Sequence, residues 1–375
     1  MNDSNFLKEI GRSYIISAFL PAAIFILLAY FLFAGFIPKS LAAQISIGTL
    51  FRDYQWIILF LFTLWSAFCL FSANDLIVRF YEGYYLPEKI KKSKVKIFRA
   101  KWDKEYKKYL EWQDYSQKIQ SKIDKKRVIQ ASELEKLANL LLDAQSALAN
   151  LSIGYPLDPE KLMPTRLGNV LRASEMYAYE RYAIAQVSIW PRLAPFLPAH
   201  FARNLEEKDN HFMFLINTSF LSQVMTLICL SIGIIGSILA GISYFYNDLA
   251  IFFAGFFLVG FDFLPFWSFF FLGAVFLGFS YVMYGISVNV AEDYGTYIRT
   301  SYDLYRAELL RQMRWKPPKT IDEEKLIWEN ISRYIIAANR LGVELPDFYQ
   351  DDLQDNLNVT QLLTPKTEQE RWPGQ

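Results

Sequence analysis

The chain has 375 residues, of which 53% are hydrophobic and 17% aromatic, and its formal net charge is only +1. This composition is more apolar than that of an ordinary soluble protein, and the excess lies in long runs, so we predict an all-α integral membrane protein. Two Cys inside apolar runs exclude a disulfide framework, and two His are too few for most metal sites.

The first apolar run extends from Ser13 to Ile37. It exceeds the apolar core of about 7–15 residues in a signal peptide and fits a membrane span of about 20 residues. Ala42 and Ala43 imitate a cleavage site, but the length of the run favours a retained span. Pro21 is expected to kink this helix near its cytoplasmic end.

A second run, Trp56 to Ala73, completes a first transmembrane hairpin that we place at residues 1–77. Beyond it, Arg79 and Glu82 stand three residues apart. They either pair at the membrane surface or belong to an ordinary solvated helix end.

Residues 78–211 are predicted to form a cytosolic helical domain with a basic start. From Arg79 to Lys136 there are 17 Lys or Arg and 9 Asp or Glu. A basic amphipathic helix beside a span indicates binding to anionic lipid at 89–109. Nucleic-acid binding competes with this interpretation but lacks a motif, and a helix that merely follows the positive-inside bias fits equally well. A further amphipathic helix is predicted from Ala131, with Ser132 and Glu135 as its capping box.

A Pro- and Arg-rich stretch, 164–198, joins this domain to the next apolar run, and we refer to it as the hub. A helix is expected at 167–183, followed by an irregular segment, because Pro191, Pro195 and Pro198 interrupt it. The hub residues expected to fix this bend through ion pairs and an interfacial ring are Arg166, Arg172, Glu175, Glu180, Arg181 and Trp190.

Enzymatic chemistry has two weak candidates. Glu175 and Glu180 can be imagined as an acid and a base, although a structural ion-pair network is favoured. His200 and His211 lie about three helical turns apart, which is too far for one metal ion. The chain contains no GxGxxG, GxSxG, HExxH or CxxC motif and no P-loop. We therefore expect no enzyme, no cofactor and no metal.

A second transmembrane pair is placed at residues 212–290, with an interfacial or re-entrant segment at 249–261. Polar residues near these spans are candidates for an ion pathway, although interface positions and, for the last of them, an outer loop are alternatives. They are Asp75, Asn217, Thr218, Gln223 and Asp262.

Small residues recur every four positions on both later spans. In lipid such stripes let helices approach closely, so we expect them to face protein. We expect the Phe-rich faces to face lipid or the interface; they carry Phe252, Phe253, Phe269 and Phe270. The stripes are Gly233, Ser237 and Gly241 on the third span and Ala274 and Gly278 on the fourth.

The positive-inside rule places both termini in the cytoplasm, because the 244–265 loop lacks Lys and Arg. Residues 291–375 are expected to form a cytosolic helical tail. Thr320 and Glu323 form a predicted capping box within it, and a disordered end is expected from Asp351.

Three blocks resemble a family of bacterial and cyanobacterial four-span membrane proteins. They are RFYEGYY (79–85), PTRLGNVLRASE…ERY…WPRL…P (164–198) and YDLYRAELL…P…W (302–328). The resemblance implies fold and inner-membrane location, and no activity or catalytic residue.

Three functions remain open from the sequence. The first is a homo-oligomeric channel or pore with a cytosolic gating or sensing domain, motivated by the polar and small residues of the spans. The second is a scaffold or anchoring subunit that recruits a cytosolic partner. The third, a membrane hydrolase, is the least favoured.

Overall fold

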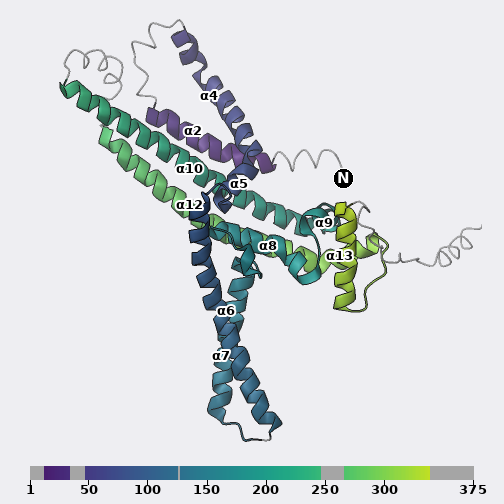
Figure 1. The fold of residues 1–375 in the computed structure, drawn as a ribbon. Coiled ribbons are helices and arrows are strands. Elements are labelled where there is room, and N and C mark those ends of the chain that lie inside the picture. The colour runs from purple at the N-terminus through teal and green to yellow at the C-terminus, as the bar shows by residue number, and fades with distance from the viewer. Residues whose placement is uncertain (1–11, 34–46, 126, 246–265, 338–375) are drawn as a thin grey trace, which may run out of the picture. The chain divides into compact units, whose positions relative to one another are not determined.

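The computed structural model describes residues 12–33, 47–125, 127–245 and 266–337, and every regular element in these ranges is helical (Figure 1). The prediction of an all-α chain is confirmed for these residues. The chain divides into two compact units. The first comprises residues 1–177 and 199–299, and the second comprises residues 178–198 and 300–375.

Four helices are long and apolar enough to cross a membrane, as the sequence predicts. They are η1–α2 (Ile15–Phe19 and Leu20–Phe33), α4 (Ile47–Ser72), α10 (Ala199–Phe245) and α12 (Phe266–Gln312). α10 and α12 each contain 47 residues, or about 70 Å, more than twice the roughly 30 Å of a hydrocarbon core. Both therefore extend well past their apolar parts. The predicted segment 249–261 and Asp262 lie outside the described residues.

A π-helical turn lies close to Pro21, where the sequence predicts a kink. Residues Ile15–Phe19 form η1 directly before the proline. Pro21 has no N–H to donate to the carbonyl of Ser17, four residues earlier. The first span therefore contains an unpaired backbone acceptor that a neighbouring helix must satisfy.

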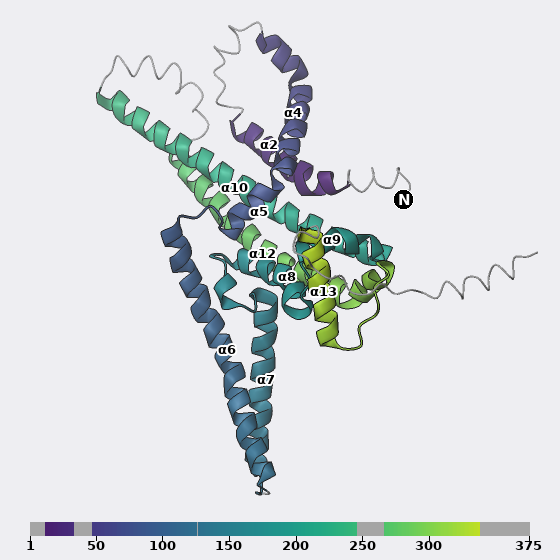
Figure 2. The ribbon, with the colours of Figure 1, turned by 45° about the vertical axis from the view of Figure 1, so that its right-hand side comes forward.

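A short helix and a long hairpin follow the second span. α5 (Asn74–Glu82) ends at Gly83, whose φ of 92° is left-handed. α6 (Glu88–Asp124) and α7 (Ala131–Gly154) then run side by side in both ribbon views (Figures 1 and 2), and we call this hairpin the arm. The capping box of α7 is formed by Gln130 and Glu133. The predicted pair, Ser132 and Glu135, is wrong by two residues because the helix begins one residue before Ser132.

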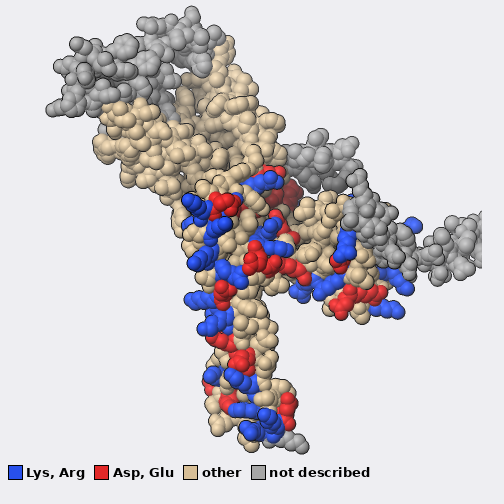
Figure 3. All heavy atoms as spheres, in the orientation of Figure 1, with Lys and Arg blue, Asp and Glu red and all other residues tan. Residues whose placement is uncertain are grey.

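Charged side chains cover the arm, whereas the apolar helices show an uncharged surface (Figure 3). The inner side of the hairpin is apolar: Trp102 and Ile119 of α6 are buried, as are Ala144, Ala147 and Leu151 of α7. Ala144 and Ala147, three residues apart, are small and let the two helices approach closely.

After the arm, η3 (Pro159–Lys161) leads into α8 (Arg166–Tyr182), which confirms the helix predicted there. The second unit contains the short α9 (Gln186–Leu193), η4 (Ala194–Phe196), the last turns of α12 and α13 (Ile321–Ala337). Its core includes Trp328 and Tyr302, both fully buried. The Pro-rich stretch thus forms no long helix, as expected.

Candidate functional site

Asn217 holds three elements of the bundle together. Its side chain is fully buried, and Nδ2 donates to the Ser17 carbonyl at 2.8 Å and to Asn74 Oδ1 at 2.9 Å. The first of these bonds satisfies the acceptor that Pro21 leaves open. Asn217 therefore links α10 to η1 and α5, and its amide is engaged in packing within one chain.

The other predicted pathway residues are dispersed. Thr218 is buried and its hydroxyl donates to the carbonyl of Phe214 in its own helix at 2.7 Å. Asp75 is exposed in the first turn of α5. Gln223 lines a cavity of about 350 Å³ together with Tyr81, Ser280 and Tyr284. These three residues thus have different surroundings: a bond within one helix, an exposed first turn and a cavity wall.

A chain of hydroxyl groups joins α5, α10 and α12 beside that cavity. Tyr81 Oη and Ser219 Oγ lie 2.9 Å apart, and Ser219 donates to the Ser280 carbonyl at 3.0 Å. Ser280 donates in return to the Ser219 carbonyl at 3.0 Å. Between helices in lipid such bonds act together with close packing, so we interpret the chain as a structural contact.

The helix face that α12 turns toward α10 differs by one residue from the prediction. A Cβ at Gly273 would lie 3.2 Å from the Leu230 side chain, whereas Ala274 and Gly278 are exposed. Phe269 is fully buried, so its predicted lipid-facing position is wrong. Phe270 is 38% exposed, and its ring would lie 3.1 Å from a Cβ placed at Gly233.

The remaining small residues of the predicted stripe on α10 make no helix contact that the structure describes. Ser237 is exposed and donates to the carbonyl of Gly233 at 2.7 Å, and the surroundings of Gly241 lie outside the described side chains. Among the described side chains of this stripe, Ser237 is thus the exposed one.

Two of the sequence blocks meet where α5 ends against the start of α8. A Cβ at Gly168 would lie 2.7 Å from the Glu82 carbonyl, and one at Gly83 would lie 2.6 Å from the Pro164 ring. Thr165 Oγ1 donates to the same Glu82 carbonyl at 3.0 Å. Only glycine permits this approach at these positions, which explains the glycines of RFYEGYY and PTRLGN.

Glu82 is the buried carboxylate of this contact. Only 8% of the residue is exposed. The pKa of Glu82 is raised to about 7, mainly by burial and also by the Glu175 carboxylate, against the opposing charges of Arg172 and Arg79. A carboxyl group that titrates near neutral pH thus lies at the junction of α5 and α8.

The hub ion pairs are only partly those expected. Arg172 and Glu175 pair at 3.3 Å, whereas Arg166 pairs with Glu292 of α12 at 3.0 Å. Glu175 and Glu180 lie five residues apart on α8, which places them on different helix faces. This spacing does not suit an acid and base acting on one bond.

The second half of the hub belongs to the second unit. Trp190 packs on Tyr302 with ring centroids 6.0 Å apart, and Tyr182 donates to Asp303 at 2.6 Å. The Arg306 guanidinium lies 3.9 Å from the Tyr182 ring centroid and pairs with a carboxylate of α13. Arg181 lies 5.9 Å from that same ring. The aromatic and charged residues of this segment thus hold a small helical unit together.

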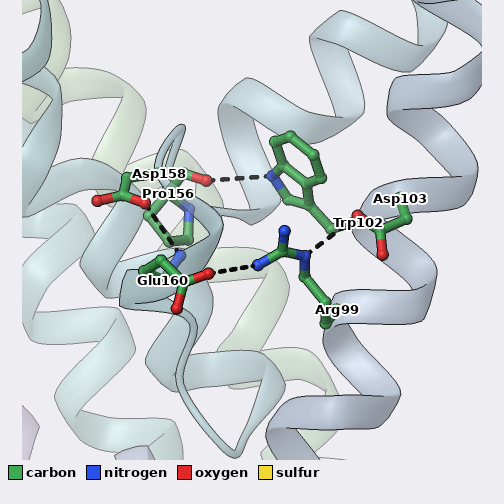
Figure 4. Close-up of polar contacts among 6 residues, drawn as sticks. All are labelled: Arg99, Trp102, Asp103, Pro156, Asp158 and Glu160. Atoms are coloured by element: carbon green, nitrogen blue, oxygen red, sulfur yellow. Dashed lines mark hydrogen bonds and ion pairs between the residues drawn. The ribbon is translucent and has the colours of Figure 1, made fainter.

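The base of the arm is fixed by polar contacts (Figure 4). Trp102 Nε1 donates to the Pro156 carbonyl at 3.3 Å, and Arg99 pairs with Glu160 at 2.9 Å. The buried Arg299 of α12 donates to the carbonyl of Ser152 in the last turn of α7. A cation near a helix C-terminus is favourable, so this contact ties the arm to α12.

α7 carries a second apolar stripe beside its packed seam. Leu134, Leu141 and Leu148 recur every seven residues, and they are 51%, 36% and 39% exposed. Residues seven apart lie on nearly the same face of a helix. Leu142, 63% exposed, lies one position off this stripe. α7 thus exposes three leucines at a seven-residue spacing.

The described ranges of the chain contain no group of three or more His, Cys, Asp or Glu that could hold a metal ion. His200 and His211 are both exposed on α10, eleven residues apart.

Comparisons with protein-family models, with curated proteins and with solved structures find no match to this chain.

Proposed function

We propose that the protein is a membrane-anchored scaffold of the bacterial inner membrane, which recruits a cytosolic partner through the arm. The observation that carries this proposal is the exposed leucine stripe of α7. α7 already packs one face against α6, so leucines left exposed to water on a second stripe do not stabilise the arm. A partner helix would bury them. Both termini and the arm lie in the cytoplasm in this account.

The arm suits docking because its base is held in place. Arg99, Trp102 and Arg299 connect it to the segment after α7 and to α12. A surface whose position is fixed before binding loses less entropy on binding. The anchoring bundle would therefore present the stripe in one orientation to the partner.

A pore formed by several copies is the second candidate. The exposed positions Ser237, Ala274 and Gly278 support it, because small residues let a neighbouring chain approach closely in lipid. Asn217 and Thr218 argue against a conducting role, because their donors already serve bonds within the chain. A scaffold predicts no ion flux through the purified protein, whereas a pore predicts flux.

Two matched variants test the scaffold. Leu141→Glu places a charge in the stripe, and Leu142→Glu places the same charge on a neighbouring, more exposed leucine. We expect Leu141→Glu to abolish recovery of the cross-linked partner complex from cells and Leu142→Glu to preserve it. Purified protein in liposomes should conduct no ions. Ion flux that Ser237→Leu blocks, together with complexes unaffected by Leu141→Glu, would replace the scaffold by the pore.

A further inference from the structure

A basic groove lies at the base of the arm, where α6 begins. It has a volume of about 540 Å³. The turn at Gly83 and Tyr84 and the side chains of Leu162 and Met163 line part of it. Facing them along α6 are Lys91, Lys92, Lys96 and Arg99. Lys92, Lys96 and Arg99 stand four and three residues apart, so they share one helix face.

The carboxylates of the groove are already paired. Glu88 pairs with Lys91 at 3.1 Å, and Glu160 pairs with Arg99 at 2.9 Å. Lys92 and Lys96 line the same groove, are exposed, and form no ion pair within the part of the chain that the structure describes. Two ammonium groups one helical turn apart therefore line this groove without an ion pair of their own, beside two carboxylates that pair with Lys91 and Arg99.

Apolar surface adjoins this groove on the side of the spans. The outward residues of α5 and of the turn after it, Leu76, Phe80 and Tyr85, are 57%, 48% and 58% exposed. The same three residues line a second, apolar groove of about 580 Å³ that continues along the first, second and third spans past Phe25 and Trp65. An aromatic turn thus separates an apolar groove from a basic one.

We propose that the basic groove binds the phosphate of an anionic phospholipid headgroup, with the acyl chains in the apolar groove. Lys92 and Lys96 contact the phosphate, and Tyr84 and Tyr85 lie at the headgroup level, where tyrosine is enriched. Ammonium groups bind phosphate as point charges. The lipid fixes the depth of α5 and thereby the position of the arm relative to the membrane.

A soluble phosphate compound carries the same charge but lacks acyl chains. The adjoining apolar groove favours the lipid, because a water-soluble ligand would leave its surface uncovered. The proposal rests on insertion of the four spans, which recovery of the protein in vesicles tests separately.

The experiment measures lipid retained by the purified full chain in native mass spectrometry, with phosphatidylglycerol against phosphatidylcholine. Lys92→Gln/Lys96→Gln is compared with Lys118→Gln/Lys125→Gln, which removes equal charge near the tip of the arm. Each cation near an anionic headgroup contributes about a factor of five in affinity, so the groove variant should bind phosphatidylglycerol about 25-fold more weakly. The tip variant should bind as the wild type does, and phosphatidylcholine binding should be equal in all three proteins.

Two outcomes would overturn the proposal. Equal retention of phosphatidylglycerol by the groove variant and the wild type would show that the groove does not bind the lipid. An equal loss of retention in the tip variant would show that the effect depends only on the net charge of the protein. Competition by millimolar glycerol phosphate in the wild type, without any preference for phosphatidylglycerol, would assign the groove to a soluble phosphate compound instead.

Discussion

The pairing of Pro21 with Asn217 predicts a specific dependence of one substitution on the other. Asn217→Leu keeps the approximate shape of the side chain but removes both donated bonds. It leaves the Ser17 carbonyl and Asn74 Oδ1 without their donor inside the bundle. Because Pro21 supplies no backbone N–H, it cannot replace the donor that the Ser17 carbonyl loses.

The magnitude follows from the two lost bonds. A buried acceptor left unsatisfied costs about 1–3 kcal/mol, whereas hydrogen bonds between helices in a membrane average about 0.6 kcal/mol. We therefore expect Asn217→Leu to lower the free energy of unfolding by about 1–3 kcal/mol. In a Pro21→Ala background, the introduced alanine offers a backbone N–H to the Ser17 carbonyl. There the same substitution should cost about 1 kcal/mol less.

The assay is equilibrium unfolding of the wild type, the two single variants and the double variant in mixed micelles, followed by tryptophan fluorescence. The control is Thr218→Val, which removes a hydroxyl bonded only within its own helix and should cost about the same in either background. An identical cost of Asn217→Leu in the wild-type and Pro21→Ala backgrounds would refute the account of the π-helical turn.

Three further predictions concern the junction of α5 and α8 and the base of the arm. Gly168→Ala should destabilise the protein by about 1–3 kcal/mol through overpacking, whereas Gly154→Ala, with open space around its Cβ, should be neutral or stabilising in thermal unfolding. The raised pKa of Glu82, about 7 against an ordinary value of 4.5, favours the protonated folded state. Its stabilising effect is complete below about pH 4.5 and is lost as pH rises through about 7, so Glu82→Gln should abolish this loss in a pH series of melting temperatures. Arg299→Met should loosen the last turn of α7 by about 1–2 kcal/mol, visible as faster hydrogen exchange around Ser152; unchanged exchange there would contradict its anchoring role.

The large features of the fold follow from the sequence. Long apolar runs predict the four membrane-length helices, and Pro191, Pro195 and Pro198 predict that no long helix follows α8, because both signals are local. Pro191 itself nevertheless lies inside the short helix α9. The hub helix is similarly predicted within one residue at each end.

Which face of each helix is buried is harder to predict from the sequence. Small residues occupy two adjacent stripes on α12, and periodicity alone does not show that Gly273 packs on α10 while Ala274 and Gly278 stay exposed. Phe269 is buried because it fills the space next to Cys229, in a cluster built from three helices. Such a choice depends on the shape of neighbouring helices.

The contacts across long sequence distances could not be predicted. Asn217 satisfies a carbonyl 200 residues away. The glycines of the two blocks are explained only when Gly168 is seen to meet Glu82 and Gly83 to meet Pro164. Pro21 is a usable signal for an unpaired carbonyl in the first span. Nothing in the sequence indicates which side chain reaches it.

The most direct test of the scaffold is photo-crosslinking in living cells from single positions on α7. A photoreactive amino acid is placed at Leu141, in the stripe, or at Leu142, one position off it. The account predicts one discrete adduct of a single partner protein from position 141 and a much weaker one from position 142. Equal labelling of many proteins from both positions, or no adduct from position 141, would contradict recruitment through the arm.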